Sequence, residues 1–175
     1  SYLMMVSPRR SAEVNNDVAS PVLVENSSNT QTVEWLAARI TDIERFVDQL
    51  PSIAVFVNSE DDVEPTATSL ETLLSEHNIP VMACREGQAV GQESSVRVFD
   101  IQHIKGLEFE AVFFLGVDRL AELQPELFDK YIYVGTTRAA AYLGLACEGV
   151  LPAQLDPVRH FAKDWTHKKR PSGSA

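Results

Sequence analysis

Short, almost wholly apolar runs alternate along this chain with longer stretches whose apolar residues recur every three or four positions. An apolar run without polar alternation is typical of a strand covered on both faces, as in a parallel sheet. The stretches between the runs have the period of amphipathic helices. The alternation predicts a three-layer α/β fold, a mainly parallel sheet with helices on both faces. The predicted strands are 21–25 (PVLVE), 53–57 (IAVFV), 81–84, 96–101 (VRVFDI), 112–117 (VFFLGV) and 142–146 (YLGLA).

Three helices are predicted between these strands. In the first, Ser28 and Gln31 have the spacing of a capping box. The second begins near Pro65, which is favoured in a first helical turn, and ends at Asn78. The third covers 127–141. The apolar positions expected to face inward are Val33, Leu36, Ala37, Ile40, Ile43, Phe46, Val47 and Leu50 in the first helix, and Ala67, Leu70, Leu73 and Leu74 in the second.

Length and composition indicate one domain, since 175 residues with 45% hydrophobic content can bury a full core. We expect a loose segment at 1–20, the folded domain at 21–165 and a flexible tail at 166–175. No apolar run reaches the roughly 20 residues of a membrane span, so we expect a cytoplasmic protein without a membrane partner. The chain opens at Ser1 instead of Met, which suggests an excised or processed fragment, although the remnant of an expression tag would look the same.

The formal net charge of −10 argues against a free-standing nucleic-acid binder, which usually presents a basic face. Basic residues gather only near the end of the chain, where a solvated tail explains them. Cys84 and Cys147 lie in apolar stretches without metal-type spacing, so buried, reduced thiols and no metal site are expected. The basic group comprises Arg159, Lys163, Lys168, Lys169 and Arg170.

Two segments carry most of the functional signal. Residues 96–118 read VRVFDIQHIKGLEFEAVFFLGVD, and 131–140 read YIYVGTTRAA. The first resembles motif V and the second motif VI of the UvrD/Rep-type superfamily-1 helicases, in the order that family has them. The chain is therefore similar to the C-terminal RecA-like (2A) domain of these ATP-dependent enzymes. The resemblance is strongest over about fifty residues.

In the first segment, Lys105, Gly106 and Glu108 are candidates for nucleotide binding. Gly106 permits a close backbone approach or a positive φ, and the Glu108 carboxylate can accept hydrogen bonds from two adjacent hydroxyls. The alternative is a tight turn at Gly106 and a helix-start carboxylate at Glu108. The resemblance implies that Glu108 binds the nucleotide sugar. Lys105 either meets phosphate or remains a solvated loop lysine.

In the second segment, Arg138 is the candidate catalytic residue. An arginine fork can stabilise charge on a transferring γ-phosphoryl group, although a lone helical arginine is often a surface ion-pair partner. The resemblance implies an arginine finger that reaches ATP held by another domain. Tyr133 and Thr137 also match motif VI, but helix packing and a local hydroxyl bond explain them equally well.

The groups that hold triphosphate are absent from the sequence. It contains neither a Gly-Lys pair, as a P-loop requires, nor an Asp-Glu pair of the kind the family uses for metal and water. The expectation is a RecA-like fold without its own P-loop, inactive alone and with no cofactor bound. ATP and Mg²⁺ would be held by an N-terminal RecA-like domain of the same protein.

Nucleic acid is expected to meet this domain at Gln102 and His103. The family usually has Thr and His just before the Lys-Gly-Leu-Glu core, whereas Asp100 and Gln102 stand here, and an aspartate repels phosphate. The predicted function is the second motor domain of a DNA or RNA helicase or translocase, with single-stranded nucleic acid as a partner of the intact protein. The alternatives are an ATP-driven motor that remodels a protein partner and a non-enzymatic interaction module.

Overall fold

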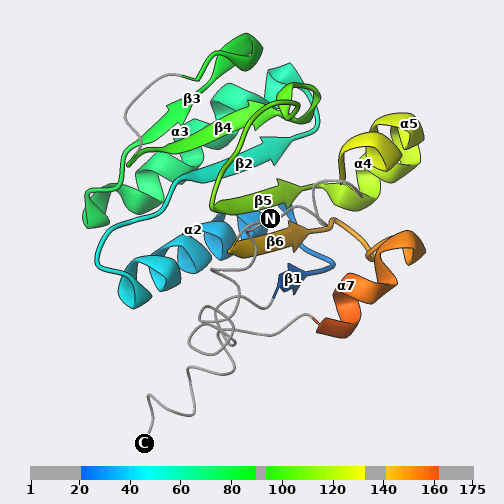
Figure 1. Ribbon diagram of the computed structural model, residues 1–175, viewed down its shortest axis with the longest axis horizontal. Helices are drawn as coiled ribbons and strands as arrows, with labels where there is room; N and C mark the ends of the chain where they lie inside the picture. Colours follow the sequence, from blue (N-terminus) through cyan, green and yellow to red (C-terminus); the bar gives the residue numbers. More distant parts are fainter. Residues whose placement is uncertain (1–20, 90–93, 133–140, 162–175) are drawn as a thin grey trace, which may run out of the picture.

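The structure, a computed structural model, describes residues 21–89, 94–132 and 141–161. Within these ranges six strands form one sheet in the order β1-β6-β5-β2-β4-β3 (Figure 1). Every adjacent pair is parallel, so the predicted parallel sheet is confirmed. The strands are β1 (Val22–Val24), β2 (Ile53–Val57), β3 (Val81–Ala83), β4 (Val96–Asp100), β5 (Ala111–Leu115) and β6 (Tyr142–Ala146).

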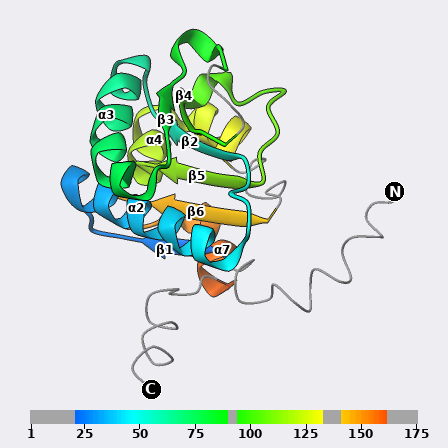
Figure 2. The same cartoon turned by 90° about the vertical axis from the view of Figure 1, so that its left-hand side faces the viewer.

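Helices cover both faces of the sheet, which confirms the three layers of a RecA-like α/β fold. One face packs against α2 (Asn29–Phe46) and α3 (Val63–Leu74), and the other against α4, α5 and α7 (Figures 1 and 2). The remaining helical elements are α4 (Val117–Leu123), α5 (Pro125–Leu127), α7 (Asp156–Phe161), the π-helix η5 (Phe128–Ile132), and the 3₁₀ turns η1 (Glu60–Asp62), η2 (Ser75–His77), η3 (Arg85–Gly87), η4 (Ile101–His103) and η6 (Ala153–Leu155).

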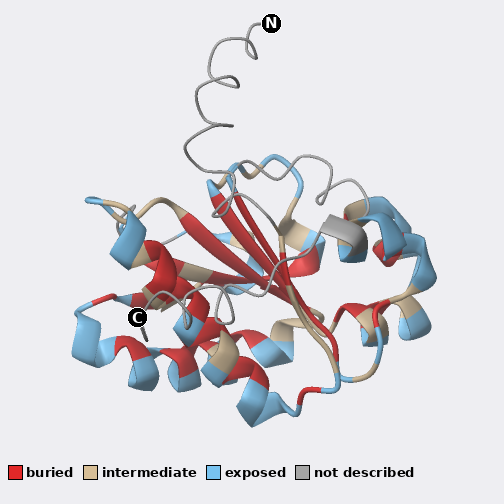
Figure 3. Ribbon diagram, turned by 90° about the horizontal axis from the view of Figure 1, so that it is seen from below, coloured by how far each residue is buried: buried red, intermediate tan, exposed pale blue. Residues whose placement is uncertain are grey.

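The sheet divides the apolar core into two clusters. On β2, Val55 points into the cluster under α2 and α3, whereas its neighbour Phe56 points into the cluster on the opposite face. Buried strands therefore lie between helices whose outer surfaces are exposed (Figure 3). No helix in the described ranges combines the length and the apolar character needed to cross a bilayer.

Helix α2 begins as predicted, but its last turn differs from the prediction. The Ser28 hydroxyl accepts the Gln31 N–H at 3.2 Å, and the Gln31 side chain accepts the Ser28 N–H at 2.9 Å, so the capping box is present. The helix ends at Phe46, where Val47 turns to extended backbone. The prediction that Phe46 faces inward is wrong, because this last turn leaves its ring 53% exposed.

Two other boundaries also differ from the sequence prediction. Helix α3 buries Leu70 and Leu74 as expected, but Leu73 is 39% exposed because it falls outside the buried stripe of the helix. The apolar run of 112–117 does not continue as a strand to its end. Gly116 adopts a left-handed φ of +67°, which ends β5 at Leu115 and lets Val117 start α4.

Gly144 in β6 allows two aromatic side chains to pack over the strand. A Cβ at this position would lie 2.3 Å from a Phe113 ring carbon and 3.2 Å from Trp35. We expect Gly144→Ala to lower the free energy of unfolding by about 2 kcal/mol, because an overpacked core must shift side chains. Urea unfolding measures this loss. In a Phe113→Leu background the same Gly144→Ala substitution should cost less stability, and equal costs in the two backgrounds would contradict the clash.

Both cysteines are free and buried, as the sequence predicts. Burial, together with the charge of the nearby Asp118 carboxylate, raises the pKa of the Cys147 thiol to about 12. A thiol with such a pKa is not a nucleophile at neutral pH. The two cysteines therefore belong to the core.

Arg159 is the one member of the predicted basic group that the described residues include. Its guanidinium nitrogen Nη1 donates to Glu25 Oε1 at 2.8 Å, which joins α7 to the residue after β1. This hydrogen bond lowers the pKa of Glu25. Arg159 is thus paired within the domain, while Lys163, Lys168, Lys169 and Arg170 lie outside the described residues.

Candidate functional site

The segment from 101 to 110 runs along the sheet from its carboxyl edge, where the strands end, to its amino edge, where they begin. Strand β4 ends at Asp100 and the parallel strand β5 begins at Ala111, so the chain between them must return from the carboxyl edge to the amino edge. Leu107 and Phe109 pack partly buried against the core on the α4 side, with the Phe109 ring 5.7 Å from that of Phe99. The candidate residues of this segment are therefore distributed over two opposite edges.

Gly106 forms a turn in this segment. Its φ is +82°, and a Cβ there would meet no atom within 4 Å, so glycine is favoured by the backbone conformation and not by crowding. Lys105 is the exposed neighbour in the same turn. Glu108 is exposed and follows in non-helical backbone, so it is not the helix-start carboxylate of the alternative interpretation.

Gly106 and Glu108 line an open cavity of about 760 Å³ at the amino edge of the sheet. Among the described residues, no hydrogen bond or ion pair engages the Glu108 side chain, so its carboxylate can accept bonds from a ligand. Lys105 does not line the cavity. The other lining residues come from the α2–β2 connection, the chain between η3 and β4, the 101–110 segment, and the starts of β4 and β6: Val47, Gln49, Leu50, Pro51, Ser52, Ala89, Ser94, Arg97, Leu107, Phe109, Glu110, Ala141 and Tyr142.

Glu110 joins three parts of the cavity wall. Its N–H donates to the Ser52 hydroxyl at 3.0 Å, and its carboxylate accepts the Ser52 N–H at 3.2 Å. Its carbonyl oxygen accepts the N–H groups of Ala141 and Tyr142, both at 3.0 Å. Burial raises the pKa of the Tyr142 hydroxyl, and the Glu110 charge raises it further. Glu110 therefore fixes the end of the 101–110 segment against the start of β6.

The motif VI residues Arg138, Tyr133 and Thr137 lie outside the described residues. The structure describes the residues directly before and after this stretch. Ile132 is buried at the end of η5, and Ala141 lines the amino-edge cavity. Ala141, which lines the same cavity as Glu108, is three positions after Arg138 in the sequence.

Gln102 and His103 lie at the opposite, carboxyl edge. They belong to η4, directly after Asp100, whose carboxylate accepts the Gln102 N–H at 3.0 Å. The Asp100 side chain is turned inward, with the residue only 4% exposed. Burial raises the pKa of its carboxyl group, and the charges of Glu60 and Asp62 raise it further, against the opposing effects of the Gln102 hydrogen bond and His103. Asp100 is therefore poorly placed to repel a strand from the surface.

Glu60 is the residue that sequence reasoning missed at this edge. Its Oε1 lies 3.6 Å from His103 Nε2. The signal that could have found it is its position just after β2, because polar residues that follow parallel strands meet at one edge of the sheet.

The fold and the two edges define an α/β domain of the RecA-like class with a ligand-accessible carboxylate at its amino edge. Residues 95–146 match the family model of the UvrD-like helicase C-terminal domain. The match covers β4 to β6 and contains both motif segments, so the predicted resemblance to this family is confirmed over that range.

A solved structure is similar over most of the chain. It is the C-terminal domain of a possible DNA helicase from Lactobacillus plantarum WCFS1, 22% identical, with 84% of this chain and 85% of that one covered and a TM-score of 0.59. At this identity the likeness is one of fold. No curated protein sequence matches the chain.

Proposed function

We propose that this chain is the second motor domain of an ATP-dependent helicase or translocase, and that its amino-edge cavity forms half of an ATP site. The match of residues 95–146 to a helicase C-terminal domain supports the class of protein. The observation that supports the site is the double hydrogen bond from Ala141 and Tyr142 to the Glu110 carbonyl, because it holds the chain that directly follows the predicted motif VI beside the segment that contains Glu108.

In this proposal each candidate residue has a separate role. Glu108 accepts hydrogen bonds from the ribose hydroxyls of the nucleotide, and the Gly106 turn sets the direction in which it projects. Arg138 supplies positive charge to the γ-phosphoryl group during hydrolysis. Lys105, exposed beside the turn, is available to a phosphate at the rim.

The triphosphate and Mg²⁺ require a partner domain in the same protein. The chain lacks the Gly-Lys pair of a P-loop, so a first RecA-like domain would have to supply the phosphate loop, the metal ligands and the attacking water. Closure of the two domains on ATP and their opening after hydrolysis would move them along nucleic acid. In this proposal Gln102, exposed at the carboxyl edge beside His103, meets a single strand away from the nucleotide.

Glu108→Ala tests the nucleotide site in the full-length protein. We expect ATP to bind about tenfold or more weakly, because a hydrogen bond to a charged group contributes roughly 1.5–3 kcal/mol. The ribose contact adds a sharper expectation: the wild type should prefer ATP to 2′-deoxy-ATP, and Glu108→Ala should lose that preference. Equilibrium binding of both nucleotides measures the two effects.

The control for this variant is Glu126→Ala, which removes an exposed glutamate of α5 that does not line the cavity. It should leave both nucleotide affinities unchanged. If Glu108→Ala binds ATP as tightly as this control and keeps the wild-type preference, Glu108 does not contact the ribose.

A further inference from the structure

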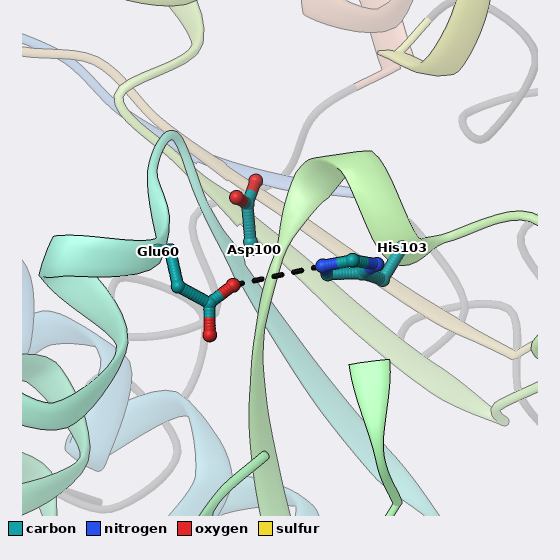
Figure 4. A group of neighbouring side chains, drawn as sticks. All are labelled: Glu60, Asp100 and His103. Atoms are coloured by element: carbon teal, nitrogen blue, oxygen red, sulfur yellow. Dashed lines mark ion pairs between the residues drawn. The ribbon is translucent and has the colours of Figure 1, made fainter. Parts of the chain in front are cut away.

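Three potential metal ligands converge at the carboxyl edge of the sheet, away from the amino-edge cavity. Glu60 comes from η1 after β2, Asp100 ends β4, and His103 lies in η4. Each contributes one ligand atom, and the three atoms lie within 4.8 Å of one another (Figure 4). The residues are up to 43 positions apart in the sequence, so no local motif announces the group.

Backbone contacts orient the two carboxylates. Glu60 Oε2 accepts the N–H of Glu86 at 2.7 Å, which leaves Oε1 facing His103. The Asp100 carboxylate accepts the N–H of Gln102 on one oxygen, and its other oxygen has no hydrogen-bond donor among the described residues. Such outer contacts are what hold metal-binding carboxylates in position.

A glycine defines the place of the imidazole ring. Gly87 has a φ of +78°, and a Cβ there would lie 2.9 Å from His103 Nδ1. The ring thus packs directly against the backbone of η3, with Nε2 directed at Glu60 (Figure 4). The three turns η1, η3 and η4 therefore all contact this small group of donor atoms.

The charges of this group are unbalanced. The Glu60 and Asp100 carboxylates lie side by side, and the negative charge of Asp62 adds to the repulsion at Asp100. Asp100 is also only 4% exposed. Like charges in a partly desolvated site oppose one another, and a buried carboxylate is costly unless it is paired. Within the described residues the only cationic candidate that faces both carboxylates is His103. A divalent cation would balance the group.

We propose that Glu60, Asp100 and His103 bind a divalent transition metal ion, with Zn²⁺ as the best chemical fit. One imidazole nitrogen and two carboxylate oxygens form a ligand set that zinc accepts, whereas Mg²⁺ and Ca²⁺ prefer oxygen ligands alone. Ligand atoms around a tetrahedral zinc are about 3.4 Å apart, given bonds of roughly 2.1 Å, so small side-chain rotations close the site. Three protein ligands leave one position open to solvent or a ligand.

The test is zinc binding by the purified chain after treatment with a chelator. Isothermal titration with ZnCl₂, together with elemental analysis after gel filtration, should give one zinc per chain. Glu60→Gln and His103→Gln should each weaken binding at least tenfold, since outer-contact losses alone cost 10- to 100-fold at metal sites. The absorption spectrum of the Co²⁺ form should also change in these variants. Thermal melts in the absence of metal verify that both variants are folded.

A second His–Glu pair provides the matched control. His77 Nδ1 lies 3.6 Å from Glu44 Oε1, the same separation as in the proposed site, but without a third ligand among the described residues. His77→Gln should leave zinc binding unchanged. The proposal is overturned if the wild type binds no zinc at millimolar concentration, or if Glu60→Gln and His103→Gln bind it as tightly as His77→Gln does. Because the assay uses no nucleotide, its result is independent of the ATP site.

Discussion

Arg138→Ala in the full-length protein should reduce the kcat of ATP hydrolysis by a factor on the order of 10² or more, with little change in ATP affinity or thermal stability. A planar guanidinium acts on charge that develops in the transition state, so its loss affects turnover more than ground-state binding. Steady-state ATPase kinetics and thermal melts on the same preparations measure the two quantities. Arg138→Lys should recover little activity, because a point charge on a flexible stem does not reproduce the fork.

A surface ion-pair role for Arg138 predicts a different outcome. Removal of an exposed ion pair changes stability by about 0–1 kcal/mol and leaves turnover near normal. Arg119→Ala provides this comparison, since Arg119 is exposed and pairs with Glu148 at 3.2 Å on the domain surface. If folded Arg138→Ala hydrolyses ATP as fast as Arg119→Ala, the arginine-finger assignment is wrong.

Phe113→Ala should produce the largest loss of stability, about 4 kcal/mol in the free energy of unfolding. Phe113 is fully buried in β5, its ring meets Trp35 edge to face at 6.1 Å, and the flat surface of Gly144 lies beneath it. Removal of the ring leaves a cavity between α2 and the sheet that this crowded layer cannot close. Urea unfolding followed by circular dichroism measures the change.

Phe46→Ala is the matched control, because it removes the same side chain from a position that is 53% exposed. Its expected effect is within about 0.5 kcal/mol, as for most surface substitutions. Equal losses in the two variants would mean that the Phe113 ring does not pack in the core as described.

The strands of this fold were predictable because each is a dense apolar run. All six appear in the structure close to their predicted ranges, and the Ser28–Gln31 capping box was also predictable because it depends on local spacing. Helix α4 was not predicted. Its first residue, Val117, continues an apolar run in the sequence, and only the left-handed backbone at Gly116 separates strand from helix. The backbone conformation of a single glycine cannot be predicted from the apolar pattern around it.

The candidate site was only partly predictable, for a geometric reason. Gly106 and Glu108 stand in one short motif, so the sequence identifies them together. Their location at the amino edge depends on how the crossing segment returns across the sheet, which a linear pattern does not reveal. Glu60 meets His103 only because β2 and β4 are neighbours in the sheet, and strand order has no local signal.

The crossing segment also has a thermodynamic consequence. Residues 101–110 begin beside His103 at one edge and end beside Glu108 at the other, and Leu107 and Phe109 anchor the middle to the core. If a ligand at either edge favoured one position of this segment, it would change the free energy of binding at the other edge. Linkage would then require the effect to be reciprocal: the factor by which a carboxyl-edge ligand altered the affinity for the proposed nucleotide would equal the factor by which the nucleotide altered the affinity for that ligand.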